Sequence, residues 1–148
     1  MHVTLMERGI VRDLLRECTS SKPHVQQAAL RFLGYAAVHG ACDGELRRRR
    51  VLITLAEPCV PQIFKLYKNF VRYLSDPETN VRLYSTMILS NIARSDESCR
   101  KLLSEGVCSK LVHLLRTEDN TQFHHLCAGT LRNLAIPRAL RGNAPVGT

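Results

Sequence analysis

The apolar and polar residues of this chain follow a helical rhythm that occurs three times. The three stretches, residues 25–37, 81–93 and 123–135, align without a gap, and we number their positions by offset from the first residue. Offsets 0, 3, 4, 7, 8, 11 and 12 are apolar or small in every copy, which marks one face of an α-helix. Long helices are therefore predicted at about residues 23–38, 79–94 and 121–136. The predicted buried positions are Val25, Ala28, Ala29, Phe32, Leu33, Ala36 and Ala37; Val81, Tyr84, Ser85, Ile88, Leu89, Ile92 and Ala93; and Phe123, Leu126, Cys127, Thr130, Leu131, Leu134 and Ala135.

Further helices are predicted before each long helix. Turn-forming residues precede the long helices, and an apolar periodic stretch lies upstream of each turn, at residues 10–15, 63–74 and 107–115. Residues 99–105 predict a short helix that Gly106 ends in a left-handed conformation. The predicted unit is thus a short helix, a glycine, a middle helix, a turn and a long helix.

The spacing of the copies predicts a helical solenoid. The second and third copies begin at residues 81 and 123, a difference of 42 residues, which is a period typical of solenoids. The first copy begins 56 residues before the second, and an elongated or additional helix around residues 44–56 would absorb the extra length. We expect an all-α solenoid of about three repeats over residues 1–137 and a disordered tail over residues 138–148. Such repeats favour a binding surface over a catalytic pocket.

The last unit resembles an armadillo repeat. The resemblance is carried by residues 95–106, 111–115 and 129–137, and it extends over roughly residues 5–137. It implies an armadillo-type right-handed helical solenoid. Residues 79–137, and the ending at 131–137 in particular, also resemble the small-GTPase GDP-dissociation stimulators (SmgGDS). That resemblance implies a cytoplasmic, non-enzymatic protein that binds small GTPases of the Rho and Rap kind, loosens their nucleotide and chaperones them around prenylation, with a nuclear location as the alternative.

Charge and cysteine usage narrow the class of protein only a little. The net charge of +8 favours an acidic partner, whether a nucleic acid, an acidic protein face or a membrane surface. The longest apolar run, at residues 51–56, is too short to span a bilayer, and no secretory signal is visible. None of the six cysteines forms a Cys-x-x-Cys pair, which favours reduced thiols in an intracellular protein.

Offset 10 of the long helices supplies the candidate partner-binding residues, Tyr35, Asn91 and Asn133. Armadillo proteins commonly place an asparagine on the long helix facing the concave groove, where its amide can bond to the backbone of an extended partner. Offset 10 lies about 100° from the middle of the apolar stripe, so these side chains should flank the core. The alternative is that an asparagine near a helix end caps it or faces water.

The positions four residues earlier argue against one class of peptide. Nuclear-import adaptors place a tryptophan there, whereas this chain has Arg31, Met87 and Gly129 and no tryptophan at all. Recognition of nuclear-localisation peptides is therefore disfavoured. A general armadillo scaffold for extended peptides remains an alternative to GTPase binding.

The densest charge run offers another alternative, a nucleic-acid or acidic-membrane binder. It consists of Arg47, Arg48, Arg49 and Arg50. Four adjacent arginines point around most of a helix, so a solvated helix with some ion pairs is the favoured interpretation. The aromatic residues that single-strand binders use for stacking are absent from the run.

Catalytic and cofactor sites are not predicted. His124, His125 and Cys127 offer metal-ligand chemistry, but no second pair at metal spacing is present and Cys127 lies in the apolar stripe. Gly40, Gly44 and Gly106 are isolated, so no phosphate-binding loop is indicated. No Cys-His pairing is singled out for nucleophilic catalysis. We therefore expect no metal, no cofactor and no enzymatic activity.

Overall fold

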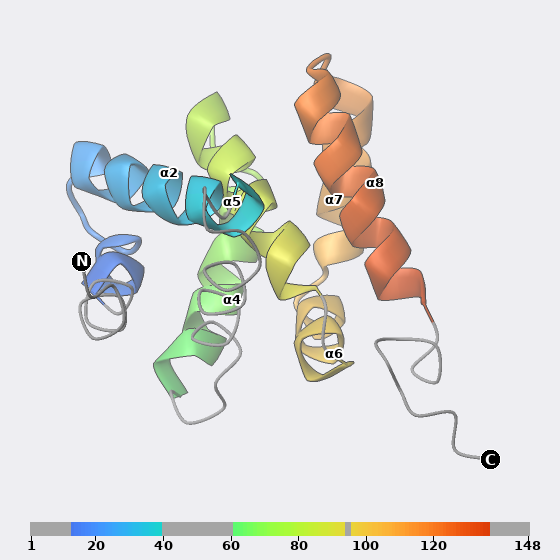
Figure 1. The fold of residues 1–148 in the computed structure, drawn as a ribbon, viewed down its shortest axis with the longest axis horizontal. Helices are drawn as coiled ribbons and strands as arrows, with labels where there is room; N and C mark the ends of the chain where they lie inside the picture. The colour runs from blue at the N-terminus through green and yellow to red at the C-terminus, as the bar shows by residue number, and fades with distance from the viewer. Residues whose placement is uncertain (1–12, 40–60, 94–95, 137–148) are drawn as a thin grey trace.

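The computed structural model describes residues 13–39, 61–93 and 96–136, and all labelled elements of this part of the chain are helices (Figure 1). The long helices lie in the predicted ranges. They are α2 (Pro23–His39), α5 (Thr79–Ile92) and α8 (Thr121–Ala135). The other helices are α4 (Pro61–Tyr73), α6 (Asp96–Ser104) and α7 (Val107–Thr117), and residues 13–17 are also helical.

Local chemistry sets the ends of these helices as the sequence predicts. Gly106 separates α6 from α7 with a φ of 74°, a left-handed conformation that costs glycine nothing because it has no Cβ. At the start of α8 the Asn120 side chain accepts a hydrogen bond of 2.8 Å from the backbone N–H of Gln122. Before α5, the carboxylate of Asp76 accepts a hydrogen bond of 2.9 Å from the backbone N–H of Glu78.

The helices stack in three layers along the chain. In the middle layer α5 packs against α2 on one side and α8 on the other, with α4 on a third side. In the last layer α7 packs against α8, while α6 contacts α4, α7 and α8 (Figure 1). We call residues 13–39, 61–93 and 96–136 the first, second and third repeats. The predicted stacked solenoid is confirmed for the residues that the structure describes.

The central position of α5 explains why it is buried nearly all round. Its predicted face, from Val81 to Ala93, is buried, and so are Thr86 and Met87 outside that face. The Thr86 hydroxyl donates to the carbonyl of Arg82 at 2.7 Å, as the Thr130 hydroxyl in α8 does to the carbonyl of Leu126 at 2.6 Å. These bonds satisfy buried hydroxyls that would otherwise cost stability.

The predicted buried face of α2 is wrong at two positions. Ala28 is exposed and Phe32 is 55% exposed, whereas Leu30 and Gly34 are buried in their place. The equivalent positions of α5, Tyr84 and Ile88, are buried, and Gly34 and Tyr35 of α2 lie against Tyr84. In the described part of the chain α2 has no long helix before it, so the same offsets remain open.

Buried hydrogen bonds connect the repeats. The Tyr73 hydroxyl of α4 donates to the carbonyl of Cys18 at 2.8 Å, which ties the second repeat to the first. The hydroxyls of Tyr67 in α4 and Ser98 in α6 lie 3.1 Å apart, which ties the second repeat to the third. The predicted additional helix around 44–56 and the predicted tail over 138–148 lie outside the described residues, and the domain limits stay a prediction.

Candidate protein-binding surface

An ion pair between repeats joins the start of α5 to the end of α7. Nε of Arg82, in α5, donates to Oε1 of Glu118, which follows α7, at 2.8 Å, and Nη2 of Arg82 lies 2.7 Å from the same oxygen. Both side chains are largely buried. Nη1 of Arg82 also donates to the carbonyls of Asp76 and Pro77, at 2.7 and 2.9 Å. One guanidinium therefore holds the turn before its own helix and the end of α7 together.

Tyr35 is the candidate that the structure presents most openly. It is 43% exposed on α2, and its ring centroid lies 5.8 Å from that of Tyr84 on α5. Arg31, one helical turn earlier, is also exposed. An aromatic ring beside a guanidinium is a common combination in protein interfaces, because both supply a large contact area and tolerate partial exposure. The predicted placement of Tyr35 beside the core is confirmed.

The predicted placement of Asn91 is wrong. Its side chain is only 4% exposed, and its Nδ2 donates to the carbonyl of Met87 in its own helix at 3.1 Å. The contact between Tyr35 and Tyr84 shows that offset 10 lies on the side of a long helix that faces the following one. Because α8 follows α5, that side of α5 is covered, and the amide of Asn91 is not presented to a partner.

Asn133, at the same offset of α8, is half-buried. Arg132 beside it and His125 two turns earlier are exposed on the same helix. The three offset-10 residues thus do not form one exposed ladder, since Tyr35 and Asn133 are separated by the buried Asn91. Arg47, Arg48, Arg49 and Arg50 lie outside the described residues, so their role stays a prediction.

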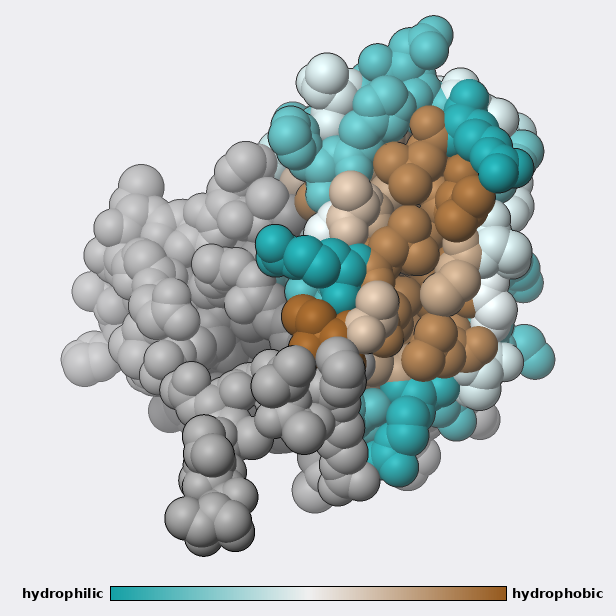
Figure 2. Space-filling view, turned by 90° about the vertical axis from the view of Figure 1, so that its right-hand side faces the viewer, coloured by the Kyte–Doolittle hydropathy of each residue, from teal (hydrophilic) through white to brown (hydrophobic). Residues whose placement is uncertain are grey.

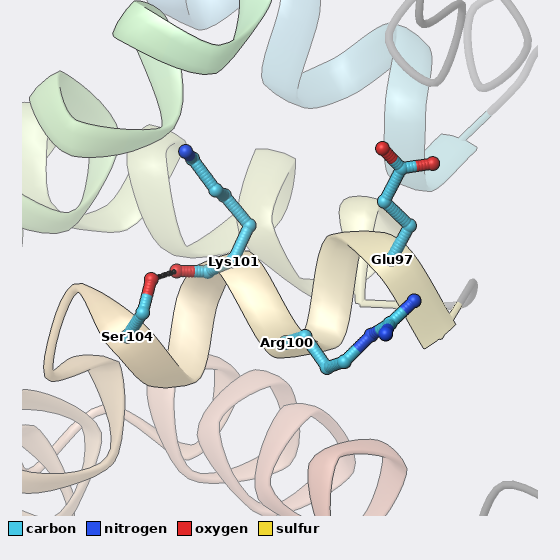
Figure 3. A pocket seen from close by; sticks show the side chains of 4 residues that line it. All are labelled: Glu97, Arg100, Lys101 and Ser104. Atoms are coloured by element: carbon cyan, nitrogen blue, oxygen red, sulfur yellow. Dashed lines mark hydrogen bonds between the residues drawn. The ribbon is translucent and has the colours of Figure 1, made fainter.

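A hollow on α6 is lined by Glu97, Arg100, Lys101 and Ser104 (Figure 3). Figure 3 shows that the side chains of Glu97 and Lys101 point to the same side of the helix, and the hydroxyl of Ser104 donates to the carbonyl of Lys101 at 2.7 Å. Its charges are mixed in sign and all come from one short helix. We assign no substrate or anion site to it.

Burial explains the chemistry of two cysteines. Cys127 is fully buried, as predicted, and burial raises the pKa of its thiol to about 11. Burial also raises the pKa of the Cys18 thiol to about 12. Both are therefore protonated core thiols at neutral pH, because burial disfavours the thiolate.

The described residues hold neither a candidate metal cluster nor a candidate membrane-spanning helix. Within residues 13–39, 61–93 and 96–136, no group of three or more histidine, cysteine, aspartate or glutamate side chains could hold a metal ion. None of the helices described is both long and apolar enough to cross a membrane.

Comparisons with known proteins agree with the stacked arrangement. No protein-family model matches the chain. A designed armadillo repeat protein superposes with a TM-score of 0.58 at 20% sequence identity, over 83% of this chain and 46% of the other. That likeness shows the fold alone.

Sequence similarity points in the same direction. Darlin of Dictyostelium discoideum is 32% identical over 146 residues, which cover 95% of this chain and 18% of Darlin. Rap1 GTPase-GDP dissociation stimulator 1-A of Xenopus laevis is 27% identical over 95 residues, which cover 59% of this chain and 16% of that protein. The chain thus spans less than a fifth of the length of these relatives. It has the armadillo-repeat fold and is similar in sequence to a GTPase-GDP dissociation stimulator over part of its length.

Proposed function

We propose that this chain is a non-enzymatic protein-binding module that engages small GTPases. The observation that carries the proposal is the similarity over 95 residues to a Rap1 GTPase-GDP dissociation stimulator. The armadillo fold supports a binding role, because stacked repeats create an extended surface and no enclosed active site. Specificity for Rho or Rap GTPases and a cytoplasmic location belong to the same proposal.

Exposed and half-buried residues of α2 and α8 form the proposed contact surface. Tyr35 and Arg31 on α2 would supply an aromatic anchor and a cation, and Arg132 and Asn133 on α8 would supply polar contacts at the other end. The net charge of +8 suits an acidic face on the GTPase and would speed the encounter. The Arg82–Glu118 ion pair joins α5, which packs against both α2 and α8, to the end of α7.

Loosening of the nucleotide would require a difference in affinity. A binding protein shifts a GTPase toward the nucleotide-free state only if it binds that state more tightly than the GDP-bound state. We propose that the module acts by this linkage. In that case it needs no catalytic group of its own, and GDP would weaken the complex by the same factor by which the module weakens GDP binding.

A binding titration tests this function. The full chain is titrated against GDP-bound and nucleotide-free Rho and Rap GTPases, and the nucleotide-free forms should bind more tightly. The double variant Arg31→Ala with Tyr35→Ala should lower the affinity by roughly tenfold or more, since anchor residues commonly cost above 1 kcal/mol when truncated. Lys68→Ala, which removes an exposed cation from α4, is the matched control and should bind like the wild type.

The polyanion alternative makes the opposite prediction. Binding to nucleic acid through the arginine run would weaken steeply as salt rises from about 50 to about 200 mM, almost regardless of base sequence. A GTPase bound through Tyr35 and its neighbours should show a shallower salt dependence. Tight, salt-sensitive binding to random RNA, together with no association with any GTPase in the panel, would overturn the proposal.

A further inference from the structure

The last repeat ends the described stack with an apolar surface. Figure 2 views the molecule from the side on which α7 and α8 lie and shows a band of hydrophobic side chains bordered by hydrophilic ones. On α7, Val112 is 36% exposed, and Cys108 and Leu115 are half-buried on the same stripe. We call these three residues, with Ala128 and Gly129 of α8, the C-terminal end face.

The same stripe of the preceding middle helix is an interface between repeats. The core residues of α4 are Leu66, Phe70 and Tyr73, and those of α7 are Val107, Leu111 and Leu114, with the same spacing. The residues that directly follow these α4 core positions, Tyr67, Val71 and Leu74, are also buried. The hydroxyl of Tyr67 is hydrogen-bonded to that of Ser98 in the following repeat. Cys108, Val112 and Leu115 are their counterparts on α7. The C-terminal end face thus repeats an interface that the chain already uses, without an occupant in the described residues.

The first repeat exposes the other half of that interface. Ala28 and Phe32 stand at offsets 3 and 7 of α2, and we call them the N-terminal end face. Their counterparts in α5, Tyr84 and Ile88, are buried, and Tyr84 packs against Tyr35 of the preceding long helix. The large side chain of Phe32, which is mostly exposed, therefore stands where it would contact a repeat that preceded α2.

The two end faces also match in the size of their side chains. Where α2 packs against α5, Gly34 allows Tyr84 to approach closely, since a Cβ on Gly34 would lie only 3.2 Å from the carbonyl oxygen of Tyr84. At the C-terminal end, Ala128 and Gly129 are small, and a Cβ on Gly129 would meet no atom within 4 Å, whereas the position equivalent to Gly34 holds the exposed Arg132. The small Ala128 and Gly129 leave room beside Arg132 for an aromatic side chain such as Phe32 of another copy.

We propose that the C-terminal end face of one copy packs against the N-terminal end face of a second copy and continues the stack of repeats between chains. Such head-to-tail contact uses two different surfaces and does not close on itself, so it builds chains of increasing length. The net charge of +8 opposes the contact at low ionic strength, and the exposed Arg132, one turn after Ala128, adds to that repulsion. Salt should therefore strengthen the association by screening this repulsion.

Sedimentation velocity of the full chain tests the proposal. The mean sedimentation coefficient should rise between about 2 and about 200 µM, and rise further when salt is added. Phe32→Glu and Val112→Glu should each weaken association at least tenfold, because a buried charge at the contact has no partner. Ser75→Glu, in the exposed turn between α4 and α5, changes the charge equally and should associate like the wild type. Unchanged helicity and melting of the dilute variants would exclude misfolding.

A mixture of the two variants provides the sharpest measurement. Phe32→Glu keeps an intact C-terminal end face, and Val112→Glu keeps an intact N-terminal one. Mixed together they should form a one-to-one pair that grows no further, although each alone is monomeric. A wild type that remains monomeric at every concentration and salt would overturn the proposal. So would dimers of Phe32→Glu alone, which would show that like ends associate.

Discussion

Arg82 of α5 and Glu118 at the end of α7, which are 36 residues apart in the chain, form an ion pair in which Nε of Arg82 donates to Oε1 of Glu118 at 2.8 Å and Nη2 lies 2.7 Å from the same oxygen. The pair belongs to two successive repeats, and the same guanidinium also binds two backbone carbonyls of its own repeat. It therefore couples the orientation of α5 to the position of α7. In a solenoid, where each repeat contacts only its neighbours, such pairs determine how cooperatively the repeats unfold.

Replacing Arg82 by methionine should destabilise the protein by about 1–3 kcal/mol, because Glu118 and two carbonyls lose a largely buried donor. Glu118→Gln should cost less, since its amide oxygen still accepts a hydrogen bond. Urea denaturation of the two single variants and the double variant measures the coupling, which should be about 0.5–3 kcal/mol. Strictly additive losses would show that the pair does not connect the repeats.

Truncation to alanine should cost different amounts of stability at two leucines of the third repeat. Leu111 of α7 is fully buried, so Leu111→Ala should lower the free energy of unfolding by about 2–5 kcal/mol. Leu131 of α8 is one of the predicted buried positions, but it is only half-buried at the edge of the core, and Leu131→Ala should cost clearly less. Thermal melts of both variants provide the measurement. An equal loss at the two positions would contradict the difference in burial.

Periodicity in the sequence was sufficient to predict the long helices and the left-handed glycine. Gly106 can adopt a left-handed conformation because it has no Cβ, and the 3.6-residue periodicity is a local property of each helix. The burial of a given position was less predictable, because it depends on neighbouring repeats. Phe32 and Ile88 share an offset, yet only Ile88 has a long helix packed over it in the described structure.

The candidate site was predictable only in part for the same reason. Tyr35 is exposed as expected, whereas Asn91 is buried because offset 10 faces the following helix. The Arg82–Glu118 pair gave no signal in the sequence, since charged residues that distant in the chain have no characteristic spacing. Long-range pairs of this kind follow from the stacking of the repeats and can be found only in a structure.

The two asparagines should respond differently to truncation. Asn91→Ala removes a buried amide that is hydrogen-bonded to Met87, and we expect a loss of about 1–2 kcal/mol in stability. Asn133→Ala changes a half-buried side chain, and stability should stay within about 0.5 kcal/mol of the wild type. Denaturation midpoints and affinity for a GTPase should be measured on the same samples. A stable Asn91→Ala variant with weakened binding would return Asn91 to the contact surface.

Alkaline pH should weaken the fold through two buried thiols. In the unfolded chain a thiol ionises above its ordinary pKa of 9.0, whereas burial raises the pKa of Cys18 to about 12 and that of Cys127 to about 11. Between these values the unfolded state binds fewer protons than the folded state, so the free energy of unfolding falls as pH rises. Each thiol contributes a slope of up to about 1.4 kcal/mol per pH unit.

Denaturation at pH 9, 10 and 11 measures this slope, and the double variant Cys18→Ala with Cys127→Ala identifies its source. The variant should be less stable at neutral pH because it leaves cavities, yet its stability should fall less between pH 9 and pH 11 than that of the wild type. Leu111→Ala is a control that is destabilised without losing a thiol and should keep the wild-type slope. If the double variant kept that slope too, other groups, such as the buried Tyr67 whose pKa burial also raises, would account for the alkaline loss of stability.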